Sequence, residues 1–172
     1  MRKLPLSGAG FFWLLLCLGL ASGPAVAVAQ PAAKTDITRT VIKMPLSKGV
    51  TIDEAISSMK LRANMLNFKL VAHQPLSEQL KAAGLKNVRR LEIYQFCNPS
   101  TAYDMVKFNM AYAAYLPCRI AVVEGKQGKG WLVMMNPQRL LSANMPSSLR
   151  KKAEKVIGDL KQIMHAGANG SL

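Results

Sequence analysis

Two cysteines, Cys97 and Cys118, restrict the possible fold more than any other feature. Residues 88–97 alternate like a strand, a helix is expected to begin after Asn98-Pro99-Ser100, and 118–124 reads as the next strand. A helix that crossed back along the sheet would make the two strands parallel and hold the cysteines ~20 Å apart. A disulfide needs Cα atoms within about 7 Å. If the cysteines pair, the two strands are antiparallel.

The alternation of side chains also predicts the face that each cysteine occupies. Cys97 shares its face with Ile93, and Cys118 shares its face with Ile120. Because both faces carry apolar residues, we expect the two sulfur atoms to lie on the same side of the sheet. The prediction is a disulfide between Cys97 and Cys118, which closes a loop of about 21 residues and contributes roughly 3 kcal/mol.

The N-terminus predicts export, which favours this pairing. Arg2-Lys3 precedes an apolar run over 11–20, and Ala27-Val28-Ala29 offers the small residues that signal peptidase reads. The run is shorter than the ~20 residues that span a bilayer. We therefore expect a signal peptide over 1–29, cleavage near Ala29/Gln30, and a periplasmic or secreted protein in an oxidising compartment.

The chain that remains after cleavage is long enough for one domain. It has 143 residues with 21 basic and 9 acidic side chains, because Arg2 and Lys3 are the only charged residues of the signal. We expect a linker over 30–36, a single domain over 37–166 and a disordered tail over 167–172. A capping box at Thr51-Ile52-Asp53-Glu54 predicts that a helix begins there.

The predicted fold class is α+β, with a largely antiparallel sheet. The order is β-α-β-β-β-β-α, with extra helices before the third strand and between the third and fourth strands. The expected strands are 37–44, 67–73, 88–97, 118–124 and 131–136, and the closing helix is 148–164.

The strongest local pattern is Phe96-Cys97-Asn98-Pro99, followed by Leu116-Pro117-Cys118-Arg119. Together with His73 after the second strand and Asn136-Pro137 after the last, it resembles the family called domain of unknown function 302, over about 41–137. The resemblance implies a small α+β domain that forms homodimers, with no activity established across the family.

The cysteines admit three interpretations. The first is the structural disulfide. The second is a thiol-redox pair, because Cys97 precedes a helix N-terminus that would favour its thiolate. The third is a copper site in which Cys97, Cys118 and His73 act as soft ligands beside a methionine. Packing is the commoner role of methionine, and Cys-x-x-Cys spacing is absent.

Catalytic patterns are missing from the sequence. It has no Ser-His-Asp set, no paired-carboxylate motif and no metal-hydrolase spacing, so we do not expect an enzyme. His73 falls on the polar face of its predicted strand, and with Asn98 and Arg119 it is a candidate for a ligand-binding cleft. The sequence therefore predicts an exported domain that binds a ligand or partner without catalysis, with thiol-redox or copper handling as the alternative.

The excess of basic residues does not identify a specific partner. The lysines and arginines are spread over several elements rather than forming a stripe with interleaved aromatic residues, and export separates the protein from nucleic acid. A solvated basic surface explains the charge. An acidic protein partner or an anionic envelope surface would be attracted to it.

Overall fold

The computed structural model describes residues 36–171. The predicted signal peptide, and the predicted linker except Asp36, lie outside the described residues. The described elements, in chain order, are the 3₁₀ helix η1 (Ile37–Thr40), β1 (Val41–Pro45), α1 (Ile52–Met65), β2 (Lys69–Gln74), α2 (Leu76–Ala82), β3 (Leu91–Cys97), α3 (Pro99–Phe108), η2 (Met110–Tyr115), β4 (Cys118–Glu124), β5 (Gly130–Met135), η3 (Pro137–Leu140) and α4 (Ser147–Asn169).

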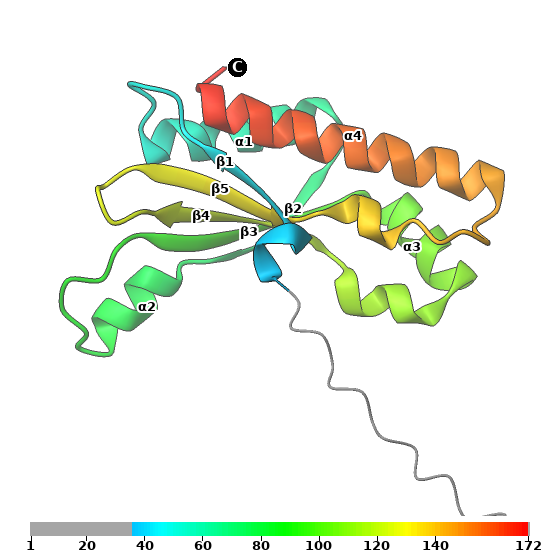
Figure 1. The fold of residues 1–172 in the computed structure, drawn as a ribbon, viewed down its shortest axis with the longest axis horizontal. Coiled ribbons are helices and arrows are strands. Elements are labelled where there is room, and N and C mark those ends of the chain that lie inside the picture. The colour runs from blue at the N-terminus through cyan, green and yellow to red at the C-terminus, as the bar shows by residue number, and fades with distance from the viewer. Residues whose placement is uncertain (1–35, 172) are drawn as a thin grey trace, which may run out of the picture. The chain divides into compact units, whose positions relative to one another are not determined.

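The five strands form one antiparallel sheet in the order β1-β5-β4-β3-β2. Helices α1 and α4 lie side by side across one face of this sheet, as Figure 1 shows. The α+β class and the predicted element order are confirmed. So is the antiparallel pairing of β3 with β4, because helix α3 leaves the sheet and returns to the same end.

Helix α1 begins as the sequence predicts. The Thr51 hydroxyl accepts a hydrogen bond from the Glu54 amide at 3.1 Å, and the Glu54 carboxylate accepts one from the Thr51 amide at 2.8 Å. These two bonds satisfy amides that have no partner within the helix. The helix then buries an apolar stripe of Ala55, Ile56, Met59 and Ala63 against α4 and the sheet.

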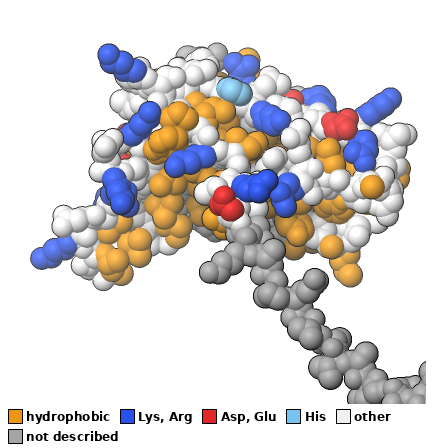
Figure 2. All heavy atoms as spheres, viewed as in Figure 1, with side chains coloured by type: hydrophobic (Ala, Val, Ile, Leu, Met, Phe, Trp, Pro, Cys, Tyr) orange, Lys and Arg blue, Asp and Glu red, His pale blue; other side chains and the backbone are white. Residues whose placement is uncertain are grey.

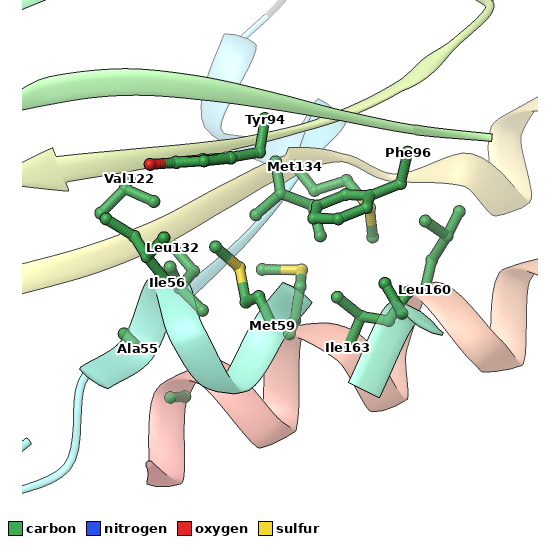
Figure 3. Close-up of a cluster of buried hydrophobic side chains, with 14 of the residues drawn as sticks. Ala55, Ile56, Met59, Tyr94, Phe96, Val122, Leu132, Met134, Leu160 and Ile163 are labelled. Carbon is green, nitrogen blue, oxygen red and sulfur yellow. The ribbon is translucent and has the colours of Figure 1, made fainter. Parts of the chain in front are cut away.

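The core lies between the two long helices and the sheet. Figure 3 shows side chains of α1 and α4 directed toward Tyr94, Phe96, Val122 and Leu132 on the strands. The helices approach closely at Gly167, where an added Cβ would lie 2.5 Å from Met59 Cγ. A smaller cluster of Met105, Met145, Leu149 and Ala153 joins α3 to the start of α4.

Three predicted boundaries are wrong. Residues 37–40 form η1 rather than a strand, because the Asp36 carboxylate accepts a hydrogen bond from the Thr38 amide at 2.9 Å and caps the turn. The helix that the sequence predicts from Pro99 through about Ala114 ends at Phe108, where Asn109 caps η2 instead. Helix α4 continues to Asn169, so the predicted disordered tail is wrong for 167–169: Gly167 and Ala168 are buried against the core.

The predicted match between the faces of β3 and β4 is wrong, because Ile93 lies opposite Ala121 whereas Ile120 lies opposite Tyr94. Glu92, Tyr94 and Phe96 point into the core under the helices, whereas Cys97 shares the other face with Ile93. Both faces of this strand carry apolar residues, so alternation alone does not decide which face is buried. The two aromatic residues bury more apolar surface on the helix-covered side.

The sheet face opposite α1 and α4 we call the open face. On β3, β4 and β5 its half-buried or exposed side chains include Leu91, Ile93, Arg119, Ala121, Val123, Trp131, Val133 and Met135. Figure 2 shows apolar side chains interspersed with lysine and arginine on the viewed side of the molecule. None of the helices within 36–171 has the length and apolar character needed to cross a bilayer.

Candidate functional site

The sequence Cys97-Asn98-Pro99 forms a tight junction between β3 and α3. The Asn98 side-chain oxygen accepts a hydrogen bond from the Thr101 amide at 3.1 Å, and Pro99 is the first helical residue. Both features are typical of a helix N-terminus, where amides lack intrahelical partners. The junction holds Cys97 at the end of the sheet.

Cys118 begins β4 and lies directly opposite Phe96. Since Phe96 points into the core, Cys118 points to the same side, and Cys97, one residue further on, points to the other. Both cysteines are free thiols, and the predicted disulfide is not present in the structure. Strand alternation directs the Cys97 side chain to the face of Ile93, yet Cys97 and Cys118 line one apolar pocket at this end of the sheet.

An apolar pocket lies where this end of the sheet meets α3, η3 and α4. Its empty space is about 530 Å³, including the open mouth, and its walls carry no charged side chain. We call it the cysteine pocket; its lining residues include Phe96, Cys97, Asn98, Ala102, Met105, Leu116, Cys118 and Leu160.

A second cavity, which we call the arginine pocket, adjoins the first on the side of the open face. Its empty space is about 590 Å³, and Arg119 is the one charged residue among those that line it. The η2 and η3 segments wall it, and the Tyr112 hydroxyl joins them by donating to the Leu140 carbonyl at 2.8 Å. The two pockets share Cys118, Pro137, Leu140 and Leu160.

The environment of the two cysteines keeps them protonated. Burial raises the pKa of the Cys97 thiol. Burial and then the neighbouring Cys97 raise the pKa of Cys118 to about 11, although Arg119 opposes this. Because the thiolate is the nucleophile in disulfide exchange and the form that binds metals, this setting suits pocket walls better than redox chemistry.

His73 lies away from the two pockets, on β2, where it is opposite Tyr94 of β3. A bulge between Leu70 and Ala72 inserts one residue into β2 and turns His73 toward the helix-covered side, so its predicted place on the polar face is wrong. The His73 ring stacks on Tyr94, with ring centroids 4.4 Å apart. The structure therefore brings together Cys97, Cys118, Asn98 and Arg119, but not His73.

His73 belongs to a polar cluster around the buried carboxylate of Glu92. The Glu92 carboxylate lies 2.7 Å from His73 Nε2, accepts from the Tyr94 hydroxyl at 2.6 Å, and pairs with Arg90, which also reaches Asp53 at 2.7 Å. Burial alone would raise the pKa of Glu92. The hydrogen bonds from Tyr94, Arg90 and His73 outweigh it and lower the pKa to about 2.

An ionised Glu92 only accepts hydrogen bonds, so His73 Nε2 carries the proton that lies between them. Sequence reasoning missed Glu92. The available signal was its alternation with Tyr94 and Phe96, since a glutamate on a strand face that buries aromatic residues requires partners. Across 36–171, no group of three or more His, Cys, Asp or Glu side chains is placed to hold a metal ion.

Comparisons with known proteins agree with this fold. No curated protein matches the chain. A crystal structure of an uncharacterized conserved protein DUF302 from Bacillus stearothermophilus has a TM-score of 0.62 and 20% sequence identity, and the match covers 74% of this chain and 97% of that chain. The family model described as domain of unknown function DUF302 matches residues 42–167, which extends the resemblance through α4. The chain belongs to the DUF302 family.

Proposed function

We propose that this chain is an exported, non-enzymatic domain that binds a small apolar ligand in the cysteine pocket. The single observation that carries the proposal is the pocket itself. It combines walls that lack any charged side chain with a position at the junction of the sheet, α3, η3 and α4. Concave, mostly apolar sites with a few polar groups are the usual form of small-molecule sites.

The polar groups of the pocket fit this role. Asn98 and Thr101 lie at the N-terminus of α3, where the Asn98 side chain is already engaged with the Thr101 amide. Cys97 and Cys118 contribute soft, weakly polar sulfur atoms that behave as small apolar groups while they are protonated. A ligand here gains mainly from burying apolar surface, at about 25 cal/mol per Å².

The thiol-redox alternative is less well supported. A reactive cysteine has a lowered thiol pKa and an electropositive setting, whereas burial raises the pKa of both cysteines here. The copper alternative needs His73 beside the two cysteines. His73 instead lies opposite Tyr94, which precedes Cys97 by three residues on β3. Its Nε2 atom is already in contact with the Glu92 carboxylate.

The test uses decan-1-ol as an apolar probe of the mature chain from Gln30. We expect amide NMR signals near Cys97, Ala102 and Cys118 to shift on titration. The variant Ala102→Phe adds a phenyl ring to the pocket wall and should weaken binding at least ten-fold. Ser100→Phe adds the same ring at an exposed position of α3 and is the matched control.

Two results would contradict the proposal. One is the absence of any shift with decan-1-ol in the wild-type chain. The other is equal binding by wild type, Ala102→Phe and Ser100→Phe, with the thermal unfolding of each variant showing that it is folded. If Ala102→Phe does not fold, Ala102→Leu makes the same comparison with a smaller side chain. The homodimer, the acidic protein partner and the anionic envelope surface stay predictions of the sequence.

A further inference from the structure

The two pockets at the end of the sheet form neighbouring compartments of different chemistry. They share Cys118, Pro137, Leu140 and Leu160, so these four residues lie between the two spaces. The first has no charged residue on its wall. The second has Arg119 as its only one. A ligand that spans both would meet apolar walls at one end and a cation at the other.

Within the described part of the chain, no carboxylate engages Arg119. Its side chain is exposed, and among residues 36–171 no ion pair involves it, whereas Arg90 is held by Asp53 and Glu92. Its cross-strand neighbour on β3 is Gln95, which is uncharged. A guanidinium offers several donors in a planar fork that fits a carboxylate or phosphate. Arg119 is therefore available to a negatively charged ligand.

The surroundings of Arg119 are mostly apolar. Ile93, Ala121, Val133 and Met135 line the same pocket from the open face of the sheet, and Tyr115 lines it from η2. Water screens a charge pair at the exposed Arg119 side chain, whereas the apolar walls beside it offer a ligand's chain surface to bury. The excess of basic residues also attracts anions at long range.

We propose that the natural ligand is an amphipathic anion, with an apolar chain in the cysteine pocket and a carboxylate or phosphate group at Arg119 in the arginine pocket. This inference rests on the proposed function, because it assigns the class of ligand to the same site. Free fatty acids and alkyl phosphates share the required chemistry. Arg119 selects the anion, and the apolar pocket supplies most of the binding energy.

The test compares three probes that differ in the head group alone: decanoate, decyl phosphate and decan-1-ol. Each is titrated into the mature chain below its micelle concentration and followed by amide NMR shifts. We expect decanoate or decyl phosphate to bind about ten-fold more tightly than decan-1-ol, which corresponds to about 1.4 kcal/mol. The tighter of the two anions identifies the head group.

The variant Arg119→Gln removes the cation. It should weaken binding of the anion about ten-fold and leave binding of decan-1-ol unchanged. Arg89→Gln is the matched control, because Arg89 is also exposed and lies with Val123 beside a cavity at the other end of β4. It should leave both affinities unchanged, apart from a small common effect of net charge.

The failures of the two proposals are distinguishable. If decan-1-ol binds as tightly as both anions, or if Arg119→Gln and Arg89→Gln behave alike, the anionic ligand is overturned while the apolar site stands. If decan-1-ol does not bind the wild-type chain, the proposed function fails and this inference falls with it. A selective effect of Arg119→Gln on the anion alone supports both.

Discussion

Phe96 on β3 lies directly opposite Cys118 on β4, and this pairing determines how the two cysteines relate. Directly opposed residues of antiparallel strands have Cα atoms about 4.5 to 5.5 Å apart and side chains on the same face. Cys97 is one residue beyond Phe96, so its backbone is close to Cys118 while its side chain starts toward the other face. The backbones of the two cysteines are therefore close, but their side chains start in different directions. This arrangement is compatible with two free thiols that line one pocket.

We expect the mature chain, purified without reductant and then denatured, to contain two reactive thiols. In the folded state both should react slowly with a disulfide reagent at pH 7, because burial raises the pKa of Cys97 and raises that of Cys118 to about 11. The rate should increase with pH as the thiolates form. A denatured sample with no free thiol, converted to two by reductant, would contradict the structure.

The buried carboxylate of Glu92 predicts a loss of stability in acid. Its pKa is about 2 in the folded protein against 4.5 for a free glutamate, so the unfolded chain binds the proton first as pH falls. The stabilisation is complete above about pH 4.5 and is lost as pH decreases toward 2, with a size of roughly 3 kcal/mol. Urea unfolding at several pH values between 6 and 2 measures it.

The variant Glu92→Gln supplies the control for this pH dependence. It should lose about 2 to 4 kcal/mol at pH 7, because Arg90 and His73 lose a charged acceptor in a buried position. Its stability should then fall less steeply between pH 4.5 and 2 than that of the wild type. Parallel pH curves for the two proteins would show that another carboxylate causes the acid sensitivity.

The sequence predicted the order of the elements more reliably than the direction of the side chains. The short distance required of Cys97 and Cys118 led correctly to antiparallel strands, although the disulfide itself is not present in the structure. Face assignments failed on β3, because both of its faces are apolar and only packing against α1 and α4 decides which is buried. The bulge in β2 places His73 on the other face, and no local sequence pattern predicts this bulge.

The candidate site was predicted only in part, for a related reason. Asn-Pro is a strong turn signal, so the sequence alone placed Asn98 and the neighbouring Cys97 at the end of a strand. The apolar walls from Met105, Leu140 and Leu160 come from three other elements that meet only in the folded chain. The pocket forms only when these elements pack together. In the sequence, the spacing of its apolar lining residues looks the same as that of ordinary core residues.

The capping box of α1 predicts a measurable contribution from Thr51. Replacing it with alanine removes the acceptor of the Glu54 amide, which lies 3.1 Å away, and should cost about 1 kcal/mol in the free energy of unfolding. Ser57→Ala is a suitable control, since Ser57 is exposed within the same helix. We expect that control to be neutral or slightly stabilising. Equal effects of the two substitutions would argue against the cap.

Two glycines of α4 provide a matched pair that tests the packing of α4 on α1. At Gly158 an added Cβ meets nothing within 4 Å, so Gly158→Ala should stabilise the protein by about 0.5 to 1 kcal/mol through helix propensity alone. At Gly167 the same Cβ would lie 2.5 Å from Met59 Cγ, 2.9 Å from Leu132 Cδ1 and 3.1 Å from the Ala55 carbonyl oxygen. Met59 has the flexibility to move, but the Ala55 backbone does not.

Gly167→Ala should therefore destabilise the protein by about 1 to 3 kcal/mol despite the same gain in helix propensity. Urea unfolding of both variants measures the difference, with an unchanged slope showing that the unfolded states are comparable. The opposite signs are the decisive feature, because both substitutions add one methyl group to the same helix. If Gly167→Ala is as stable as Gly158→Ala, α4 does not pack against Met59 and Leu132 as closely as the structure shows.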